Sequence, residues 1–159
     1  MSEFDATIEW RRPEGAAFVD GRYSRSHRWR FDGGATIAAS SSPHSVPLPF
    51  SVAENVDPEE ALVAALSSCH MLFFLSLAAK RGFVVDQYRD AARGTMARNA
   101  QGRMAMTKVI LAPQVEYAGS SPDRATEELL HHQAHELCYI ANSVTAEVET
   151  RLAHRERAA

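Results

Sequence analysis

The sequence lacks a long run of lysines and arginines, and its first residues lack an apolar run. Its 17 lysines and arginines are scattered, and the net charge is −3 with neutral histidines. Nucleic acids and anionic membranes need a clustered basic footprint, so neither is expected as the main partner. The N-terminus from Met1 to Asp5 carries acid and no apolar run, so no signal peptide is visible. We therefore expect a cytoplasmic protein.

Long apolar runs and abundant cysteine are also missing. The most apolar stretch, Met71 to Ala79, is far too short to cross a bilayer of roughly 30 Å. There are two cysteines, Cys69 and Cys138, and in the cytosol such residues are more often free, catalytic or metal-bound than a structural bridge. A chain of 159 residues can bury enough surface without a disulfide. We expect one domain, residues 1–159.

Alternation and turn signals predict the order of the elements. Apolar and polar residues alternate from Phe4 to Trp10, which predicts a half-buried strand. Asp32-Gly33-Gly34 signals a hairpin turn. Further strands are expected from Phe83 towards Met96, over 104–117 and over 144–148. Two helices fall between these groups, and the order strands, helix, strands, helix, strand is typical of an α+β domain.

The clearest helix begins after Asp57. Asp57 is a good N-cap, Pro58 suits the first helical position, and two glutamates follow where the helix dipole favours negative charge. Only four residues of 61–79 are polar, and Gly82 fits a left-handed cap after the helix. A helix that is apolar on nearly every face should be buried on nearly every face. We expect it at the centre of the fold or of a dimer.

Cys69 lies within this helix, among Ser67, Ser68 and His70. A lone buried cysteine usually packs as a small hydrophobe. Three polar neighbours are unusual there, because burying an unpaired polar group costs roughly 1–3 kcal/mol, and they indicate a pocket or an interface. A mid-helix thiol does not receive the N-terminal dipole, so a reactive Cys69 needs a nearby cation. The basic segment from Arg22 to Arg30 could supply one, although most of its arginines fit a solvated strand face.

Other chemical templates fit less well. His131 and His135 share a helix face with Cys138, which would allow a metal site. A zinc site usually draws on four ligands with recognisable pairs, and no such pair occurs around Cys69, so an exposed polar helix face is the better interpretation. His70 points about 100° away from Cys69, which argues against a Cys-His hydrolase dyad. Gly-rich phosphate loops and the Gly-x-Ser-x-Gly elbow are absent from the sequence.

The run VDPEEALVAALSSCH, from Val56 to His70, resembles the signature of the OsmC/Ohr family of hydroperoxide-reducing proteins. In that family a Pro-Glu-Glu-like helix start precedes the peroxidatic cysteine by the same interval. A second cysteine follows on a later helix, here Cys138, ahead of a closing strand. The resemblance covers nearly the whole chain. It implies an OsmC-like α+β domain with antiparallel sheets around a buried central helix, in an intertwined homodimer.

The resemblance also implies four site residues: a peroxidatic cysteine, a resolving cysteine, a helix-start glutamate and an arginine from the early strands, here Cys69, Cys138, Glu59 and Arg25. Arg22 and Arg28 are the alternatives to Arg25. Many relatives have Cys-Pro where this chain has Cys138-Tyr139. Glu59 and Cys69 are ten residues apart, or about 15 Å along a straight helix, so they cannot meet within one helix. If both act at one site, Glu59 comes from a partner chain with the arginine bridging the two.

The implied function is a thiol peroxidase that reduces organic hydroperoxides, with hydrogen peroxide as a secondary substrate. An external dithiol, lipoyl-like in the Ohr branch, would regenerate it, and no bound cofactor or metal is expected. A pocket lined by Leu72, Phe73 and Phe74 would favour organic peroxides, although plain core packing explains these residues equally well. Two other functions stay open. One is a non-enzymatic dimeric stress or binding protein of the same fold with inert cysteines, and the other is a Cys-dependent hydrolase.

Overall fold

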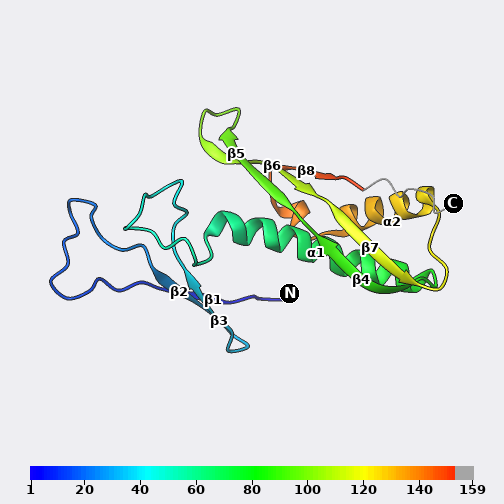
Figure 1. Cartoon of the computed structure of the whole chain (residues 1–159), viewed down its shortest axis with the longest axis horizontal. Helices are drawn as coiled ribbons and strands as arrows, with labels where there is room; N and C mark the ends of the chain where they lie inside the picture. The colour runs from blue at the N-terminus through cyan, green and yellow to red at the C-terminus, as the bar shows by residue number, and fades with distance from the viewer. Residues whose placement is uncertain (153–159) are drawn as a thin grey trace. The chain divides into compact units, whose positions relative to one another are not determined.

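Strands and helices alternate in the order expected for an α+β chain in the computed structural model, which describes residues 1–152 (Figure 1). Internal contacts divide the chain into two compact units. The first runs from Met1 to Ala61, and the second begins at Leu62. The single domain over 1–159 stays a prediction.

The first unit contains a three-stranded antiparallel sheet in the order β1-β2-β3. Its strands are β1 (Ala6–Glu9), β2 (His27–Phe31) and β3 (Thr36–Ala39). The β2–β3 turn holds Gly34 at a φ of 86°, a conformation that glycine adopts without steric strain, so the hairpin prediction is confirmed. The half-buried strand expected from Phe4 to Trp10 is shorter, and all four residues of β1 are exposed. β1 is an edge strand, and the unit buries its side chains mainly between Ala39 and Asp57.

The long helix α1 (Pro58–Lys80) has the boundaries that the sequence predicts. At its start the Glu60 N–H donates to Asp57 Oδ1 over 2.8 Å, and the Asp57 N–H donates to Glu60 Oε2 over 3.4 Å. This reciprocal pair is a capping box. At its end Gly82 has a φ of 81°, and the Phe83 N–H donates to the carbonyl of Ala78. That bond satisfies a carbonyl that the helix itself leaves free.

Burial of α1 is narrower than expected. Four residues at intervals of four form the buried stripe: Leu66, His70, Phe74 and Ala78. The opposite stripe includes Ser68 and Leu72, and the Leu72 side chain is 62% exposed. The expectation of burial on nearly every face therefore does not hold for a single chain. A helix lying on a single-chain core normally carries a charged outer face, and α1 has none between its first turn and Lys80.

Length does not distinguish α1 from a membrane helix, contrary to the expectation drawn from 71–79. Within residues 1–152 one helix, α1, is both long enough and apolar enough to cross a bilayer. In the structure 22% of its most apolar 18-residue window is buried. Core helices of soluble proteins meet the same criterion. The buried stripe of α1, which packs on α2 (Arg124–Leu137) and on strands, fits a core helix.

The second unit forms two further sheets. β4 (Val84–Asp90) pairs antiparallel with β7 (Pro113–Ala118). β5 (Arg93–Arg98) pairs antiparallel with β6 (Met104–Leu111), and β8 (Glu147–Thr150) runs parallel to β6. The two strands expected over 83–96 and 104–117 are therefore each broken into two. The closing strand begins at Glu147 rather than Val144, because a short 3-10 helix, η1 (Ala141–Ser143), follows α2.

The Asp90 carboxylate lies where β4 ends and is hydrogen-bonded to the residue between β6 and β7. Asp90, the last residue of β4, accepts a hydrogen bond from the backbone N–H of Ala112 over 2.7 Å. Its other oxygen accepts from the Ser67 hydroxyl over 2.6 Å. Ala112 is the residue between β6 and β7, so Asp90 links the ends of two strands to α1. Ser67 lies two residues before Cys69, and this link positions that turn of α1 against the sheets.

Candidate thiol redox site

The two cysteines lie beside each other in the second unit. Cys69 is half-buried in α1, and Cys138 is 1% exposed at the C-cap of α2. The Cys69 thiol is a hydrogen-bonding neighbour of Cys138, and both are free thiols. Packing of α2 on α1 thus brings together two residues that are far apart in the sequence.

The surroundings of Cys138 keep its thiol protonated at neutral pH. Burial, chiefly, and the neighbouring Cys69 raise the pKa of Cys138 to about 11. The backbone N–H of Ala141 donates to Cys138 Sγ over 3.4 Å and opposes the rise in pKa. This bond comes from η1, so the chain reversal after α2 aims a backbone donor at the sulfur. Such a donor stabilises the thiolate when it forms.

Aromatic and apolar side chains border the cysteines, but not as the sequence suggested. Phe73 packs edge-to-face on Tyr139, with ring centroids 5.0 Å apart, directly after Cys138. Phe74 is fully buried in the α1–α2 core, and Leu72 is exposed. Leu72, Phe73 and Phe74 therefore do not line one pocket within this chain, and the alternative of core packing is confirmed for Phe74. Successive helix residues point about 100° apart, which sends the three side chains in different directions.

The other two predicted site residues belong to the first unit. The Arg25 guanidinium lies over the Tyr23 ring, 3.7 Å from its centroid. It also donates to the carbonyl of Gly21 over 2.7 Å and to that of Tyr23. Glu59 is half-buried in the first turn of α1. Their roles beside the cysteines stay predictions.

Histidines form a feature that sequence reasoning missed. His70 and His131 are 1% and 2% exposed, and His70 Nε2 lies 3.0 Å from His131 Nδ1. The exposed polar face expected for α2 is correct for His132 but wrong for His131. Within the described residues no group of three or more histidine, cysteine or acidic side chains is placed to hold a metal. The burial of His70 could have been predicted from the sequence, because His70 follows Leu66 by four residues and so lies on the same buried face of α1.

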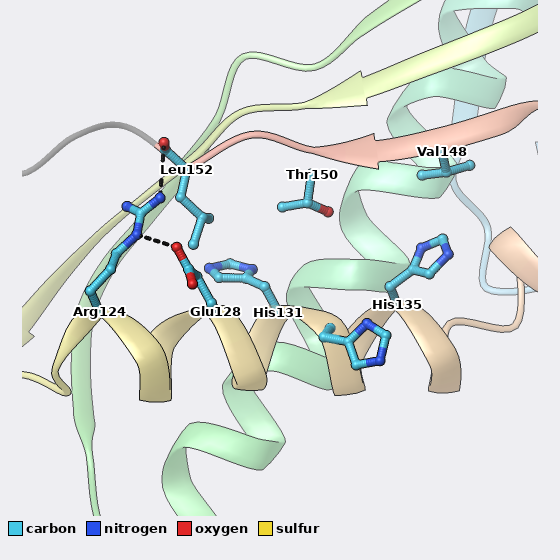
Figure 2. Close-up of a pocket in the computed structure, with 8 residues that line it drawn as sticks. Arg124, Glu128, His131, His135, Val148, Thr150 and Leu152 are labelled. Atoms are coloured by element: carbon cyan, nitrogen blue, oxygen red, sulfur yellow. Dashed lines mark hydrogen bonds and ion pairs between the residues drawn. The ribbon is translucent and has the colours of Figure 1, made fainter.

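A groove runs along α2 beneath β8 (Figure 2). Its volume is about 360 Å³. His131 and His135 line it from α2, and Val148 and Thr150 line it from β8. At one end the Arg124 guanidinium pairs with Glu128 over 2.6 Å (Figure 2). The groove therefore gives the buried histidines an opening toward the surface.

The fold and the site define a class: an α+β chain in which two helices bring two thiols together. The sequence profile of the OsmC-like protein family matches residues 52–153. The solved structure of an OsmC-like protein of unknown function from Vibrio cholerae O1 biovar eltor is 55% identical, with a TM-score of 0.94. The match covers 96% of this chain and 100% of that one. The chain belongs to the OsmC family, as its sequence signature indicated.

More distant structures share the fold. An organic hydroperoxide resistance protein from Elizabethkingia anophelis is 16% identical, with a TM-score of 0.67 and coverage of 96% of this chain and 94% of that one. OhrB of Bacillus subtilis, another organic hydroperoxide resistance protein, is 14% identical, with a TM-score of 0.66 and coverage of 96% and 98%. No curated protein matches the chain in sequence. Membership of this family supports a soluble protein, and the cytoplasmic location stays a prediction.

Proposed function

We propose that the protein is a thiol peroxidase that reduces organic hydroperoxides, with Cys69 as the peroxidatic and Cys138 as the resolving cysteine. The observation that carries the proposal is the direct neighbourhood of the two free thiols between α1 and α2. Two structures of the same fold are described as organic hydroperoxide resistance proteins, which agrees with this chemistry. Hydrogen peroxide is a second, poorer substrate in this proposal.

The two cysteines are suited to different steps. A thiolate attacks peroxide, and Cys138, with a pKa of about 11 and 1% exposure, is the poorer first nucleophile. Half-exposed Cys69 attacks the peroxide, the O–O bond breaks, and the alkoxide takes a proton to leave as an alcohol. Cys69 is then a sulfenic acid. Cys138 condenses with it, which gives the disulfide and water, and an external dithiol such as a lipoyl group reduces the disulfide.

A cation should assist the first step, because both the thiolate and the departing alkoxide are anionic. Arg25 is our candidate, with Glu59 holding its guanidinium in a bidentate pair. α1 is one uninterrupted helix, so the ten residues between Glu59 and Cys69 correspond to about 15 Å of helix. We therefore propose that Glu59 of a second chain completes the site in a homodimer. The weakly covered surface of α1 supports such an interface.

The preference for organic peroxides rests on the apolar border of the site. Phe73 and Tyr139 pack together beside Cys138, and Tyr139 is 73% exposed. An alkyl or aryl group can be buried against these rings, whereas hydrogen peroxide has no apolar part to bury. Phe73→Ala should therefore raise the KM for cumene hydroperoxide more than that for hydrogen peroxide.

The test is peroxide consumption by reduced protein, with cumene hydroperoxide and dihydrolipoamide. Turnover should disappear in Cys69→Ser. In Cys138→Ser without the dithiol, one equivalent of peroxide should be consumed, and a sulfenic acid should persist at Cys69, detected by mass spectrometry after dimedone trapping. If the wild-type protein consumes no peroxide and forms no disulfide, the peroxidase proposal is wrong. A non-enzymatic binding protein of the same fold then becomes the better hypothesis.

A further inference from the structure

Three histidines form a cluster between α1 and α2 that the proposed reaction has not used. His70 Nε2 and His131 Nδ1 are hydrogen-bonded over 3.0 Å, and their rings are stacked with an interplanar angle of 6°. His131 also stacks on Phe74, with ring centroids 4.1 Å apart. His135 lies one helical turn after His131 on α2, and its charge lowers the pKa of His70. Core packing thus holds the first two rings in a fixed arrangement beside the third.

The His70–His131 pair is uncharged at neutral pH. Burial, first, and the charge of His135, second, lower the pKa of His70 to about 4, while the Asp90 carboxylate opposes this shift. Burial lowers the pKa of His131 to about 3, with contributions from His70 and Arg124. A neutral imidazole has one N–H donor and one acceptor nitrogen. Two hydrogen-bonded neutral rings can therefore pass a proton between them by exchanging tautomers.

The outer atoms of the cluster are unpaired. His70 Nδ1, His131 Nε2, His135 Nδ1 and the hydroxyl of Tyr88 on β4 are buried without a hydrogen-bond partner among the described residues. Burial raises the pKa of Tyr88, so it also faces the cluster as a neutral group. Buried polar atoms are rarely left without a hydrogen bond because this destabilises the fold, so stability alone does not explain four of them. His131 and His135 line the groove beneath β8 (Figure 2), where the cluster opens toward solvent.

Cys138 needs a route for its proton. The thiol is 1% exposed, and its pKa is about 11. It must nevertheless lose its proton when the disulfide forms and regain one when the disulfide is reduced. His135 precedes Cys138 by three residues and His131 precedes it by seven, so all three lie on one face of α2.

We propose that His135, His70 and His131 are a proton relay between the Cys138 thiol and the groove beneath β8. This inference rests on the proposed function, because the relay acts in the resolving step. There the S–S bond forms as the S–O bond of the Cys69 sulfenic acid breaks and hydroxide leaves. The Cys138 proton enters the relay, and a proton leaves at His131 Nε2. Hydroxide takes a proton from solvent beside half-exposed Cys69 and becomes water, so Cys138 sulfur is oxidised and Cys69 sulfur is reduced.

The test uses His131→Asn in the full chain. An asparagine amide can occupy the position of Nδ1 and keep the bond to His70, but it removes Nε2 and cannot pass a proton. Reduced protein is mixed with one equivalent of cumene hydroperoxide and quenched at intervals with dimedone and an alkylating agent. Sulfenic acid should form at the wild-type rate, and disulfide closure should slow by about a hundredfold, as expected for loss of a proton-transfer group. Added imidazole should restore part of the closure rate.

The matched control is His132→Asn, the next residue of α2, whose side chain is exposed. It should close the disulfide at the wild-type rate. Wild-type closure in His131→Asn would overturn the relay. A slowed closure that imidazole does not accelerate would also overturn it, because it would indicate a structural role. His131→Gln, which keeps a polar atom near Nε2 but cannot titrate, repeats the test if the asparagine variant fails to fold.

Failure of the relay and failure of the peroxidase proposal give different results. If the wild-type protein forms no sulfenic acid, the peroxidase proposal fails. Oxidised dithiothreitol can still drive closure of the Cys69–Cys138 disulfide by thiol exchange, and Cys138 loses the same proton there. Equal closure rates for the wild-type protein and His131→Asn in that assay would overturn the relay. Slower closure in the variant would support it without peroxide.

Discussion

At the scale of single residues, the two cysteines to which the family resemblance assigns different roles also lie in different environments. Cys69 lies on a half-covered turn of α1, whereas Cys138 is enclosed at the end of α2 and receives an N–H from η1. The difference arises from position in the tertiary packing. It agrees with the proposed order, in which Cys69 reacts with peroxide before Cys138.

Cys138 should be the slower thiol toward alkylation. With a pKa of about 11, it is only about one-thousandth ionised near pH 8. Iodoacetamide should therefore modify Cys69 first, by on the order of tenfold or more in rate. Peptide mass spectrometry over a time course measures both rates. Faster modification of Cys138 would contradict the assignment of Cys69 as the peroxidatic residue.

The buried histidine pair should make the protein sensitive to mild acid. Both folded-state pKa values, about 4 for His70 and about 3 for His131, lie below the ordinary value of 6.5. Below pH 6.5 the unfolded chain binds protons that the folded chain does not, so the free energy of unfolding falls as the pH decreases toward 4. The slope is at most about 1.4 kcal/mol per pH unit for each histidine.

Urea unfolding between pH 7 and pH 4 measures this loss of stability. The Glu149 carboxylate acts in the same direction below about pH 5, because hydrogen bonds from Arg151 and Lys108 lower its folded-state pKa to about 2 while the unfolded chain takes up this proton near the ordinary value of 4.5. The loss between pH 7 and pH 5 therefore reports the histidines. Ring proton shifts in NMR spectra give the control. The ring protons of His70 and His131 should not change above pH 5. Titration of both near pH 6.5 would contradict the buried pair.

At the scale of elements, local chemistry predicts the helix ends well and the sheet breaks poorly. Asp57 and Gly82 act within a few residues of themselves, so sequence spacing identifies both ends of α1. The breaks after Asp90 and at Ala112 depend on a carboxylate that bonds to α1 and to a distant strand. Such contacts link residues far apart in the sequence, so the local alternation of apolar and polar residues does not predict them. The prediction that His131 is exposed was wrong for the same reason, since His70, to which its ring is hydrogen-bonded, lies on α1.

The cap of α1 should be worth about 1 kcal/mol, the usual effect of replacing an N-cap aspartate by alanine. Asp57→Ala removes the acceptor for the Glu60 N–H. Chemical denaturation of this variant measures the loss. Glu54→Ala, an exposed change just before the cap, should leave the unfolding free energy unchanged within experimental error. Equal stability of the two variants would show that the capping box contributes nothing.

Close approach of α1 to β5 requires glycine at position 94. A Cβ there would lie 2.7 Å from Val63 Cγ2 and 2.5 Å from Met106 Sδ. Gly94→Ala should therefore destabilise the fold by about 1–3 kcal/mol, the usual range for overpacking. Adding Val63→Ala should recover part of the loss, because it removes one of the clashing atoms. Gly33→Ala, with no neighbour within 4 Å, is the control and should have little effect.

At the scale of the whole molecule, the sequence identified the family and left the assembly to be tested. The run from Val56 to His70 sufficed for the family because it contains the helix start, the cysteine and their spacing. The roles of Arg25 and Glu59 stay predictions, since both lie in the first unit and the cysteines lie in the second.

Complementation between inactive chains tests the shared site. A Glu59→Gln chain and a Cys69→Ser chain should each lack peroxidase activity as homodimers. Coexpressed, they should form mixed dimers with one intact site, and random pairing predicts about a quarter of wild-type activity. No recovery in purified mixed dimers would contradict a site shared between chains, and an active Glu59→Gln homodimer would exclude a role for Glu59. Sedimentation velocity confirms the oligomeric state of each preparation.

The uncharged outer side of α1 also bears on how the chain survives before it finds a partner. A newly made chain that shows Leu72 and its half-covered neighbours to water is a target for chaperones and for aggregation. In the proposed homodimer a second chain covers this surface, so folding and association would be linked by mass action and the melting temperature would rise with protein concentration. Cellular abundance would then set stability together with sequence. A cell that makes too little of such a dimer would hold it mostly as protease-sensitive single chains.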